Sequence, residues 1–307
     1  MKKEILISTS SFGKVDATAL ELLENNGFSV ELNPFGSTMT QEQSIELLKN
    51  KVGLIAGTEK INALTFDSTN TLKYICRLGT GMDSVDLVEA KKRGIVVENT
   101  PDAHIDGVAE LCLAGMLDLH RDISLSHSQM KAGVWKKPMG TLLKGKTLGL
   151  IGLGKVSKRL IELLQAFDLK IMATDIHWDE EFASKWNIKK TTINEIMEQS
   201  DVVSIHIPYS TANRHIIGSR ELAMLKNNAK VINTSRGGLV DENALISFLT
   251  DNPSARAYID TFENEPYSGE LVKLNNVLVT PHIGSYAKEV RMNMELECAN
   301  KIIAFFS

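Results

Sequence analysis

Short apolar runs alternate with amphipathic segments along most of the chain. In the first third, the apolar runs predict buried strands at residues 4–9, 29–32, 52–56, 73–76 and 95–98. Between them, apolar residues spaced three and four positions apart predict helices over residues 15–25, 41–50 and 85–93. Strands that alternate with helices are typical of a parallel sheet with helices on both faces.

The alternation returns after residues 103–131, a predicted helix that is apolar on more than one side. Such a helix is buried widely, either in a core or between two subunits. Further strands are predicted near Lys170, Val202, Lys230, Ala257 and Val277. Apolar residues at every fourth position over 287–306 predict a closing helix that packs back on the first module. Because 307 residues exceed what one hydrophobic core organises, we expect two domains.

The composition is that of an ordinary globular protein, with 43% hydrophobic and 23% charged residues. A net charge of −4 argues against nucleic acid or an anionic membrane as partner, because either requires a basic surface. Cys76, Cys112 and Cys298 lack metal-binding spacing, so we expect no metal and a reduced, cytoplasmic protein. The apolar stretch near the start is too short for a signal peptide, and no run could span a bilayer.

A glycine-rich turn follows the predicted strand at residues 148–151. Gly152 permits a tight turn, Gly154 lets the backbone approach phosphate oxygens, and a helix that begins near Lys155 directs N–H groups at an anion. The third position of this fingerprint is Ser157, in place of glycine or alanine. The pattern predicts a pyrophosphate site, although any α/β protein can contain a glycine-rich turn.

An acidic residue ends the next predicted strand. Asp175 follows Gly152 by 23 positions, the distance at which a carboxylate meets the adenosine ribose of NAD and repels the extra phosphate of NADP. The two features together favour an NAD site over a simple turn.

Three consecutive strand ends carry Arg236, Glu265 and His282. Taken singly, each has an ordinary explanation: a surface ion pair, a solvated loop acid and a buried histidine. The carboxyl ends of parallel strands meet at one edge, however, and ligands bind at that edge. We therefore expect the three side chains to lie together.

These residue types suit the reduction of a carbonyl by a nicotinamide. Histidine can supply the proton, a carboxylate can orient the ring, and arginine can hold a substrate carboxylate with two N–H groups. The set predicts a dehydrogenase of 2-hydroxy acids that uses His282 as acid and base and Glu265 as its partner. His206 also ends a strand, and we expect it to line the adenine or phosphate side of the cofactor.

A second glycine loop follows the fourth predicted strand and comprises Arg77, Leu78, Gly79, Thr80 and Gly81. Such a loop can direct several backbone N–H groups at a carboxylate, or it can be a tight turn before the next helix. The local sequence does not distinguish a carboxylate site from a tight turn, so the position of the loop in the chain has to decide.

Seven motifs follow one another along nearly the whole chain. They are Arg-Leu-Gly-Thr-Gly-Met-Asp-Ser-Val-Asp from 77, Asn-Thr-Pro from 99, Val-Ala-Glu from 108, Gly-Leu-Gly from 152, Ile-Asn-Thr-Ser-Arg-Gly from 232, Glu-Asn-Glu-Pro from 263 and Pro-His-Ile-Gly-Ser from 281. In this order they resemble the NAD-dependent D-isomer-specific 2-hydroxyacid dehydrogenase family, most closely its phosphoglycerate dehydrogenase branch.

The resemblance implies an α/β fold of two Rossmann-like parallel-sheet domains, the cofactor domain being inserted into a discontinuous substrate domain. Residues 1–98 and 285–307 would form the substrate (lid) domain, and residues 99–284 the NAD-binding domain with a dimerisation arm. It implies that Arg236, Glu265 and His282 are catalytic and that residues 77–81 bind the substrate carboxylate. The implied NAD contacts are Gly152, Gly154, Lys155, Val156, Asp175, His206, Pro208, Thr234, Asp260 and Gly284.

Some positions depart from the family pattern and leave the substrate open. His104 stands where the family usually has Asn, and Asp102 where it often has Gly. Residues 135–140 echo the phosphoglycerate branch and, with Arg77, could supply cations for a phosphate, or they could be a solvated turn. We expect D-3-phosphoglycerate or a related acid as substrate. The alternatives are a glyoxylate, hydroxypyruvate or D-lactate type of reductase, and a non-catalytic protein that senses NAD(H).

Overall fold

The computed structural model describes residues 2–307, which fold into two compact units. One unit contains the chain up to His104 together with Ser285–Ser307, and the other contains Ile105–Gly284. The first boundary lies after His104, where residue 98 was expected. The segment between β5 (Val96–Asn99) and His104 stays with the first unit, because the Nδ1 atom of His104 lies 2.8 Å from the hydroxyl of Thr80.

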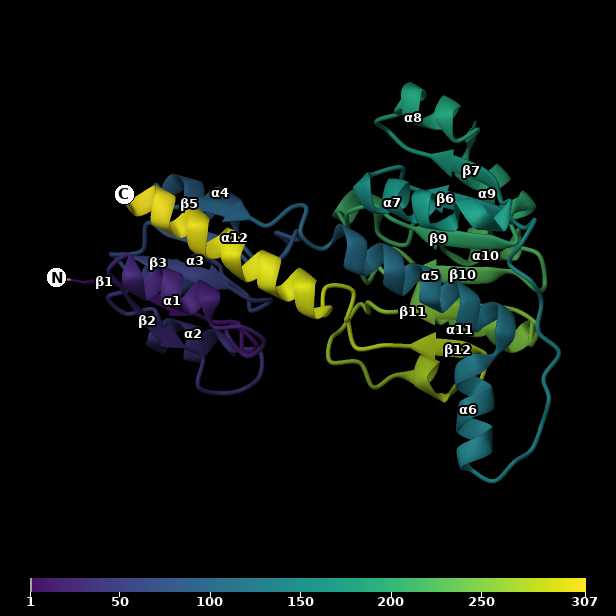
Figure 1. Ribbon diagram of the computed structural model, residues 1–307, viewed down its shortest axis with the longest axis horizontal. Coiled ribbons are helices and arrows are strands. Elements are labelled where there is room, and N and C mark those ends of the chain that lie inside the picture. The colour runs from purple at the N-terminus through teal and green to yellow at the C-terminus, as the bar shows by residue number, and fades with distance from the viewer. Residues whose placement is uncertain (1) are drawn as a thin grey trace. The chain divides into compact units, whose positions relative to one another are not determined.

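The first unit is built on a five-stranded parallel sheet in the order β2-β1-β3-β4-β5 (Figure 1). The strands are β1 (Lys3–Ile7), β2 (Phe28–Leu32), β3 (Gly53–Ala56), β4 (Tyr74–Arg77) and β5 (Val96–Asn99). The helices are α1 (Thr18–Asn25), α2 (Gln41–Leu47), α3 (Ala63–Asp67), α4 (Leu87–Lys92) and α12 (Lys288–Phe306). The five predicted strands are confirmed to within two residues at each end. Helix α3 was not predicted, because its 5 residues are too few to show a period.

The closing helix α12 packs on the first unit, as predicted. In Figure 1 it runs beside α1 and across the sheet. Its side chains Val290, Met294, Cys298 and Ile302 are buried in one core with the apolar residues of β1 and β4. The stripe of apolar residues at every fourth position is therefore the face that covers the sheet.

The second unit contains a seven-stranded parallel sheet in the order β12-β11-β10-β9-β6-β7-β8. The strands are β6 (Thr147–Ile151), β7 (Lys170–Thr174), β8 (Lys189–Lys190), β9 (Val202–Ile205), β10 (Lys230–Asn233), β11 (Arg256–Ile259) and β12 (Val277–Val279). The helices are α5 (Ile105–Arg121), α6 (Ile123–Lys131), α7 (Lys155–Leu164), α8 (Glu180–Lys185), α9 (Ile193–Gln199), α10 (Ser219–Ala223) and α11 (Glu242–Asp251). Short 3₁₀ turns span Gln165–Phe167, Thr211–Asn213 and Glu270–Lys273.

The order of this sheet reverses between β6 and β9. From β6 the chain continues outward through β7 and β8, and then returns to β9 on the other side of β6. Ligands of open parallel sheets bind beyond the carboxyl ends of the strands at such a reversal. The loops after β6 and β9, which carry Gly152 and His206, flank it.

The prediction of one helix over residues 103–131 is wrong, because the helix breaks at Asp122. Asp122 adopts a left-handed conformation with φ 50°, and its carboxylate accepts a hydrogen bond of 3.0 Å from Arg256. The Asp118 carboxylate then accepts hydrogen bonds from the backbone N–H (2.7 Å) and the hydroxyl (2.9 Å) of Ser124. These contacts end α5 and start α6 in a new direction.

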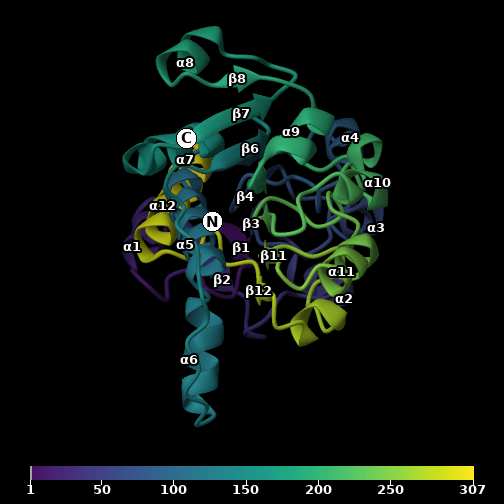
Figure 2. The ribbon, with the colours of Figure 1, turned by 90° about the vertical axis from the view of Figure 1, so that its right-hand side faces the viewer.

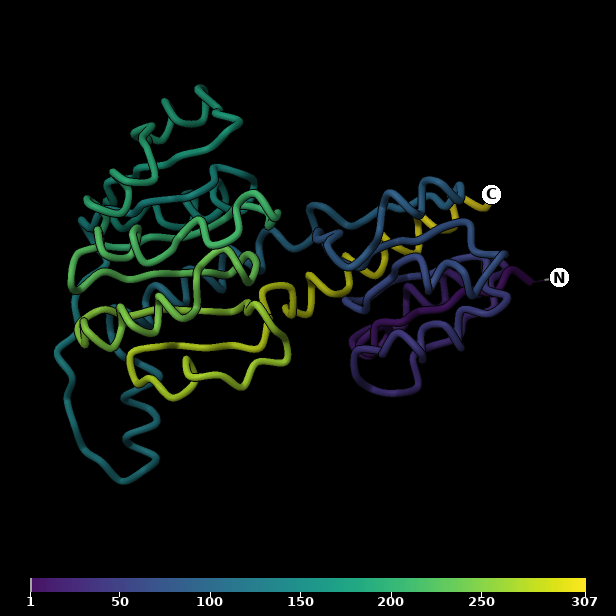
Figure 3. The backbone as a smooth tube through the Cα atoms, turned by 180° about the vertical axis from the view of Figure 1, so that it is seen from behind, coloured from purple at the N-terminus to yellow at the C-terminus, as the bar shows by residue number. Residues whose placement is uncertain are grey.

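Helix α6 extends away from the sheet of the second unit (Figure 2), and residues 132–146 return along it to β6 (Figure 3). None of the described residues of α6 is buried. This arm, residues 123–142, exposes large apolar side chains: Ile123, Met130, Val134, Trp135, Met139 and Leu142.

Within residues 2–307, no helix combines the length and the apolar character needed to cross a membrane. The same residues contain no group of three or more His, Cys, Asp or Glu side chains arranged to hold a metal ion.

Candidate active site

The glycine turn after β6 is shaped by close contact with the loop after β9. Gly152 has φ +100°, and a Cβ there would lie 2.4 Å from the carbonyl oxygen of His206. Only glycine fits this position without displacing the neighbouring backbone. Ser157 is buried and donates a hydrogen bond of 2.7 Å to the Gly152 carbonyl, so the serine ties the helix to the turn.

Helix α7 begins beyond the turn with Gly154 as its N-cap. Gly154 provides no side-chain cap for the first N–H groups of the helix. A Cβ on Gly154 would meet no atom of the described residues within 4 Å. An uncapped helix N-terminus beside open space fits a bound pyrophosphate.

Replacing Gly154 with alanine should leave stability nearly unchanged and weaken NADH binding. The new methyl group has room in the protein alone, and Gly154 has an extended backbone (φ −76°) that alanine adopts readily. It would occupy the position where the backbone must approach phosphate, so we expect NADH affinity to fall about 10-fold, or 1.4 kcal/mol. Thermal unfolding and NADH titration check the two parts. Gly152→Ala should instead destabilise the fold, and equal NADH affinity in Gly154→Ala would contradict the assignment.

Asp175 follows β7 and is half-buried. Its carboxylate accepts hydrogen bonds from the backbone N–H groups of Leu153 (2.5 Å) and His177 (2.7 Å). The acid that the sequence assigns to the ribose therefore also braces the glycine turn.

His206 lies on the other side of the sheet reversal. Its Nε2 is 2.8 Å from the hydroxyl of Ser204. Burial lowers the pKa of His206 to about 4, so the ring is neutral near pH 7. A neutral ring offers a bound phosphate no positive charge. Pro208, two residues on, is exposed.

The loop after β10 presents Arg236 from a rigid turn. The Asn233 side chain donates to the carbonyl of Arg236 (2.7 Å) and accepts from the N–H of Ser235 (3.2 Å). A Cβ on Gly237 would lie 2.0 Å from the carbonyl carbon of Phe262. Glycine at 237 thus allows the Arg236 loop to touch the segment that carries Glu265. The adjacent Thr234 is buried.

Glu265 and His282 form a direct pair. The Nδ1 atom of His282 lies 3.0 Å and 3.1 Å from the two carboxylate oxygens of Glu265. One of these oxygens also accepts the N–H of Phe262 at 3.1 Å. Within residues 2–307, no hydrogen bond involves Nε2 of His282, so this nitrogen is available to a substrate.

The pKa of Glu265 lies below its ordinary value. Burial alone would raise this pKa, but the hydrogen bond and charge of His282, the Phe262 N–H and the charge of Arg236 together lower it. Glu265 is therefore ionised near pH 7. The charge of Arg236 is the smallest of these effects, and it acts on the same carboxylate that contacts His282.

Asp260 supports the backbone on both sides of His282. Its carboxylate is buried and accepts the N–H groups of Ile283 (2.8 Å) and Gly284 (3.0 Å) and the hydroxyl of Thr280. Its carbonyl accepts the N–H of His282 at 2.8 Å. The resemblance implied that Asp260 contacts NAD. The contacts in this structure are those of a residue that positions His282.

The second glycine loop belongs to the first unit. The N–H of Leu78 donates to the carbonyl of Ala56 (2.9 Å), and the N–H of Gly79 donates to the hydroxyl of Thr100 (2.9 Å). The N–H groups of Thr80 and Gly81 make no hydrogen bond within the part of the chain that the structure describes. Of the backbone donors of this loop, these two consecutive N–H groups thus remain for a carboxylate.

Arg77 lies beneath this loop. It is buried, it donates to the carbonyl of Leu78, and a Cβ on Gly79 would lie 2.8 Å from its Nη1. Glu59 is buried nearby and accepts the hydroxyl of Ser8. Burial raises the pKa of Glu59, while the Ser8 hydrogen bond and the charge of Arg77 act in the opposite direction. Arg77 therefore supports the loop from within the unit.

Sequence reasoning missed several of these supporting residues. Glu59 contacts the distant Ser8 and lies in no motif. Thr100 lies in the Asn-Thr-Pro motif, but nothing in the motif shows that its hydroxyl accepts the N–H of Gly79. His215 had no notable sequence setting, yet its Nε2 lies 2.8 Å from Glu263, a second histidine–carboxylate pair in this unit.

Comparisons with known proteins indicate one family. Residues 113–284 match the family model described as D-isomer specific 2-hydroxyacid dehydrogenase, NAD binding domain. A glyoxylate reductase of Thermococcus litoralis is 37% identical over 258 residues, covering 81% of this chain and 78% of that protein. A D-3-phosphoglycerate dehydrogenase of Methanocaldococcus jannaschii is 36% identical over 279 residues, covering 89% of this chain but only 52% of that protein, so this chain spans about half its length.

A solved structure has the same fold over nearly the whole chain. The crystal structure of the TT0316 protein from Thermus thermophilus is similar with a TM-score of 0.88 at 29% identity. The similarity covers 96% of this chain and 94% of that one.

Proposed function

Because the chain belongs to the D-isomer specific 2-hydroxyacid dehydrogenase family, we propose that it interconverts a D-2-hydroxy acid and its 2-oxo acid with NAD. The observation that carries the proposal is the His282–Glu265 pair, whose second imidazole nitrogen is available while Arg236 lies close to the carboxylate. When bound, NAD supplies the hydride or accepts it.

His282 moves the proton in this proposal. During reduction, Nε2 donates a proton to the oxygen of the 2-oxo group, and during oxidation the same nitrogen takes it back. Glu265 accepts a hydrogen bond from the Nδ1–H group, which fixes the orientation of the ring. Asp260 holds the backbone that carries the ring.

Arg236 binds and polarises the substrate. A guanidinium stays charged and can hold the carboxylate and the 2-oxo oxygen with parallel N–H groups. We propose that the N–H groups of Thr80 and Gly81 also bind the substrate carboxylate, as the resemblance implies, with Arg77 and Thr100 holding that loop in shape.

Two substrate classes follow from different observations. Residues 135–140 resemble the phosphoglycerate branch and include the exposed Lys136 and Lys137, so we propose D-3-phosphoglycerate or a related acid first. The burial of Arg77 beneath its loop favours the second candidate, a small acid of the glyoxylate or hydroxypyruvate type.

A panel of 2-oxo acids with NADH tests the proposal. We expect NADH oxidation with at least one of 3-phosphohydroxypyruvate, hydroxypyruvate, glyoxylate and pyruvate, and the ratio of kcat/KM values selects the substrate class. Absence of NADH oxidation with all of them, together with an NADH-dependent change in oligomer size, would favour an NAD-sensing protein.

Asp175 should set the choice of cofactor. Replacing Asp175 with alanine removes the carboxylate that would repel the extra phosphate of NADP. We expect the kcat/KM ratio of NADH to NADPH to fall about 10-fold or more, the effect of 1.4 kcal/mol. Because Asp175 also braces Leu153, Asp175→Asn, which keeps an acceptor, is the control for the glycine turn. Equal use of both cofactors by the unmodified protein would contradict this role.

The exposed arm supports a homodimer, which we propose for this chain in the cytoplasm. A surface with Trp135 77% exposed and Met139 95% exposed is typical of an interface. The double substitution Trp135→Glu and Met139→Glu should convert a dimer into a monomer in size-exclusion chromatography with light scattering. Leu64→Glu, an exposed leucine of α3, is the matched control and should remain a dimer. A monomeric unmodified protein would refute the proposal.

A further inference from the structure

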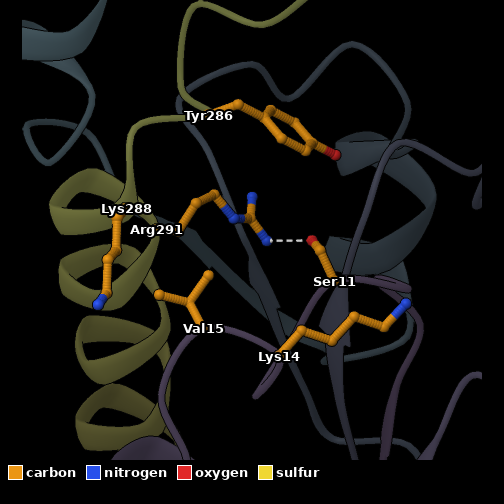
Figure 4. A pocket seen from close by; sticks show the side chains of 6 residues that line it. All are labelled: Ser11, Lys14, Val15, Tyr286, Lys288 and Arg291. Carbon is orange, nitrogen blue, oxygen red and sulfur yellow. Dashed lines mark hydrogen bonds between the residues drawn. The ribbon is translucent and has the colours of Figure 1, made fainter.

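A basic pocket lies in the first unit, between the loop after β1 and the start of α12 (Figure 4). It has a volume of about 400 Å³ and is lined by Ser11, Lys14, Val15, Tyr286, Lys288 and Arg291. None of these residues belongs to the catalytic or cofactor set described above. The loop after β1 is at the carboxyl edge of the parallel sheet, where open α/β folds bind ligands.

Arg291 forms the base of the pocket. Its side chain is only 7% exposed, and Nη2 donates to the Ser11 hydroxyl at 2.7 Å, as Figure 4 shows. A second, longer contact of 3.5 Å joins Nη2 to Glu295. The buried Nε of Arg291 has no hydrogen-bond partner within residues 2–307. Because Nε is itself buried, it is not open to the pocket; the charge of the guanidinium is opposed by Glu295 only through the contact of 3.5 Å.

The other polar groups of the lining are also donors. Lys14 and Lys288 contribute ammonium groups, and the exposed Tyr286 contributes a hydroxyl on a ring whose centre lies 5.2 Å from the guanidinium carbon of Arg291. The lining contains no carboxylate among the described residues. Every polar side chain that faces the pocket can therefore donate a hydrogen bond to an anion.

The neighbouring acids leave a positive excess. Glu295 is buried behind Arg291 and accepts the N–H of Gly13 at 3.0 Å. Asp16 is partly exposed; its pKa is lowered mainly by hydrogen bonds from Thr18 and slightly by Lys288. The two acids Glu295 and Asp16 therefore do not balance the three cations of the lining. Lys288 is also the first residue of α12, whose N-terminus carries a partial positive charge and has no side-chain cap. An anion in the pocket would balance the excess positive charge of the side chains and that of the helix N-terminus.

We propose that this pocket binds a phosphate group, either as inorganic phosphate or as the monoester of a small metabolite. A phosphate dianion has acceptor oxygens for several donors. Its negative charge would balance the positive charges of Lys14, Lys288 and Arg291. The proposal stands apart from the proposed dehydrogenase activity, because it involves no residue of the catalytic or cofactor set.

Calorimetric titration of the full chain with inorganic phosphate tests it. Saturating NADH is present throughout, so that the glycine turn after β6 cannot bind the probe. We expect saturable binding that weakens about 5- to 10-fold in Lys14→Ala/Lys288→Ala, because each exposed ion pair is worth up to about 1 kcal/mol. The control Lys91→Ala/Lys92→Ala removes two lysines from α4 of the same unit and should bind as the unmodified protein does.

A second variant distinguishes the contribution of the Arg291 guanidinium from that of the net charge. Arg291→Gln/Glu295→Gln keeps the charge of the unit unchanged and should abolish binding, while circular dichroism checks that the unit is folded. A parallel titration uses glycerol 3-phosphate, a phosphate monoester. Whichever of the two ligands binds more tightly shows whether the pocket prefers a monoester or inorganic phosphate. Absence of saturable binding, or equal binding by the unmodified protein and all variants, would overturn the proposal.

Discussion

Replacing His282 with alanine should lower the turnover of 2-oxo acid reduction by at least ~100-fold, the loss expected when a general acid is removed. The Nε2 atom is the donor in the proposed reaction, and no other histidine shares the contact with Glu265 within residues 2–307. The glycine turn that would bind NAD is built from other residues, so NADH affinity should persist. Steady-state rates and NADH titration measure the two quantities. Near-normal rates in this variant would remove His282 from the mechanism.

Glu265, which contacts the His282 ring, should give the reaction a pH dependence of its own. The pKa of Glu265 is lowered by His282, by the Phe262 N–H and by Arg236 in spite of burial, so the carboxylate remains negative through the neutral range. Glu265→Gln keeps an acceptor for the ring N–H but removes this titrating carboxylate. In the unmodified protein, activity should fall on the acid side only where Glu265 becomes protonated, at a pH below the ordinary pKa of a glutamate, and the variant should lack this acid limb. The same acid limb in both proteins would contradict a role for the Glu265 carboxylate.

The second large effect is expected at Arg236. Replacing it with glutamine removes the cation that holds the substrate carboxylate, which typically costs 2–5 kcal/mol, or about 30- to 1,000-fold or more in kcat/KM. NADH affinity should change little. Arg236→Lys keeps the charge but loses the paired N–H groups and should restore only part of the rate.

Arg214 provides the matched control for this variant. It lies in the same unit, is exposed, and pairs with Glu263 at 3.1 Å. Arg214→Gln should retain activity within a few-fold, because exposed ion pairs contribute at most about 1 kcal/mol. Equal losses in both variants would point to a general charge effect and would contradict a specific contact of Arg236 with substrate.

Much of the fold could be predicted from the sequence, because buried parallel strands are short apolar runs and the closing helix has a regular stripe. Chain order then placed Arg236, Glu265 and His282 at one edge. The break at Asp122 could not be predicted, because it depends on a left-handed residue held by Arg256, which is distant in the sequence.

The supporting residues of the site were harder to predict than its functional groups. The sequence marks Gly237 within a motif and Asp260 as an expected NAD contact. No local pattern shows that Gly237 contacts Phe262 or that Asp260 accepts two N–H groups beyond His282. The same applies to Thr100, which takes the N–H of Gly79 and so reduces the number of donors left in that loop.

The most direct test of the proposed reaction is the configuration of its product. Reduction of hydroxypyruvate or its 3-phosphate by NADH should give only the D-hydroxy acid, with one molecule formed for each NADH oxidised. Formation of the L-acid, or NADH loss without a hydroxy acid, would contradict the account.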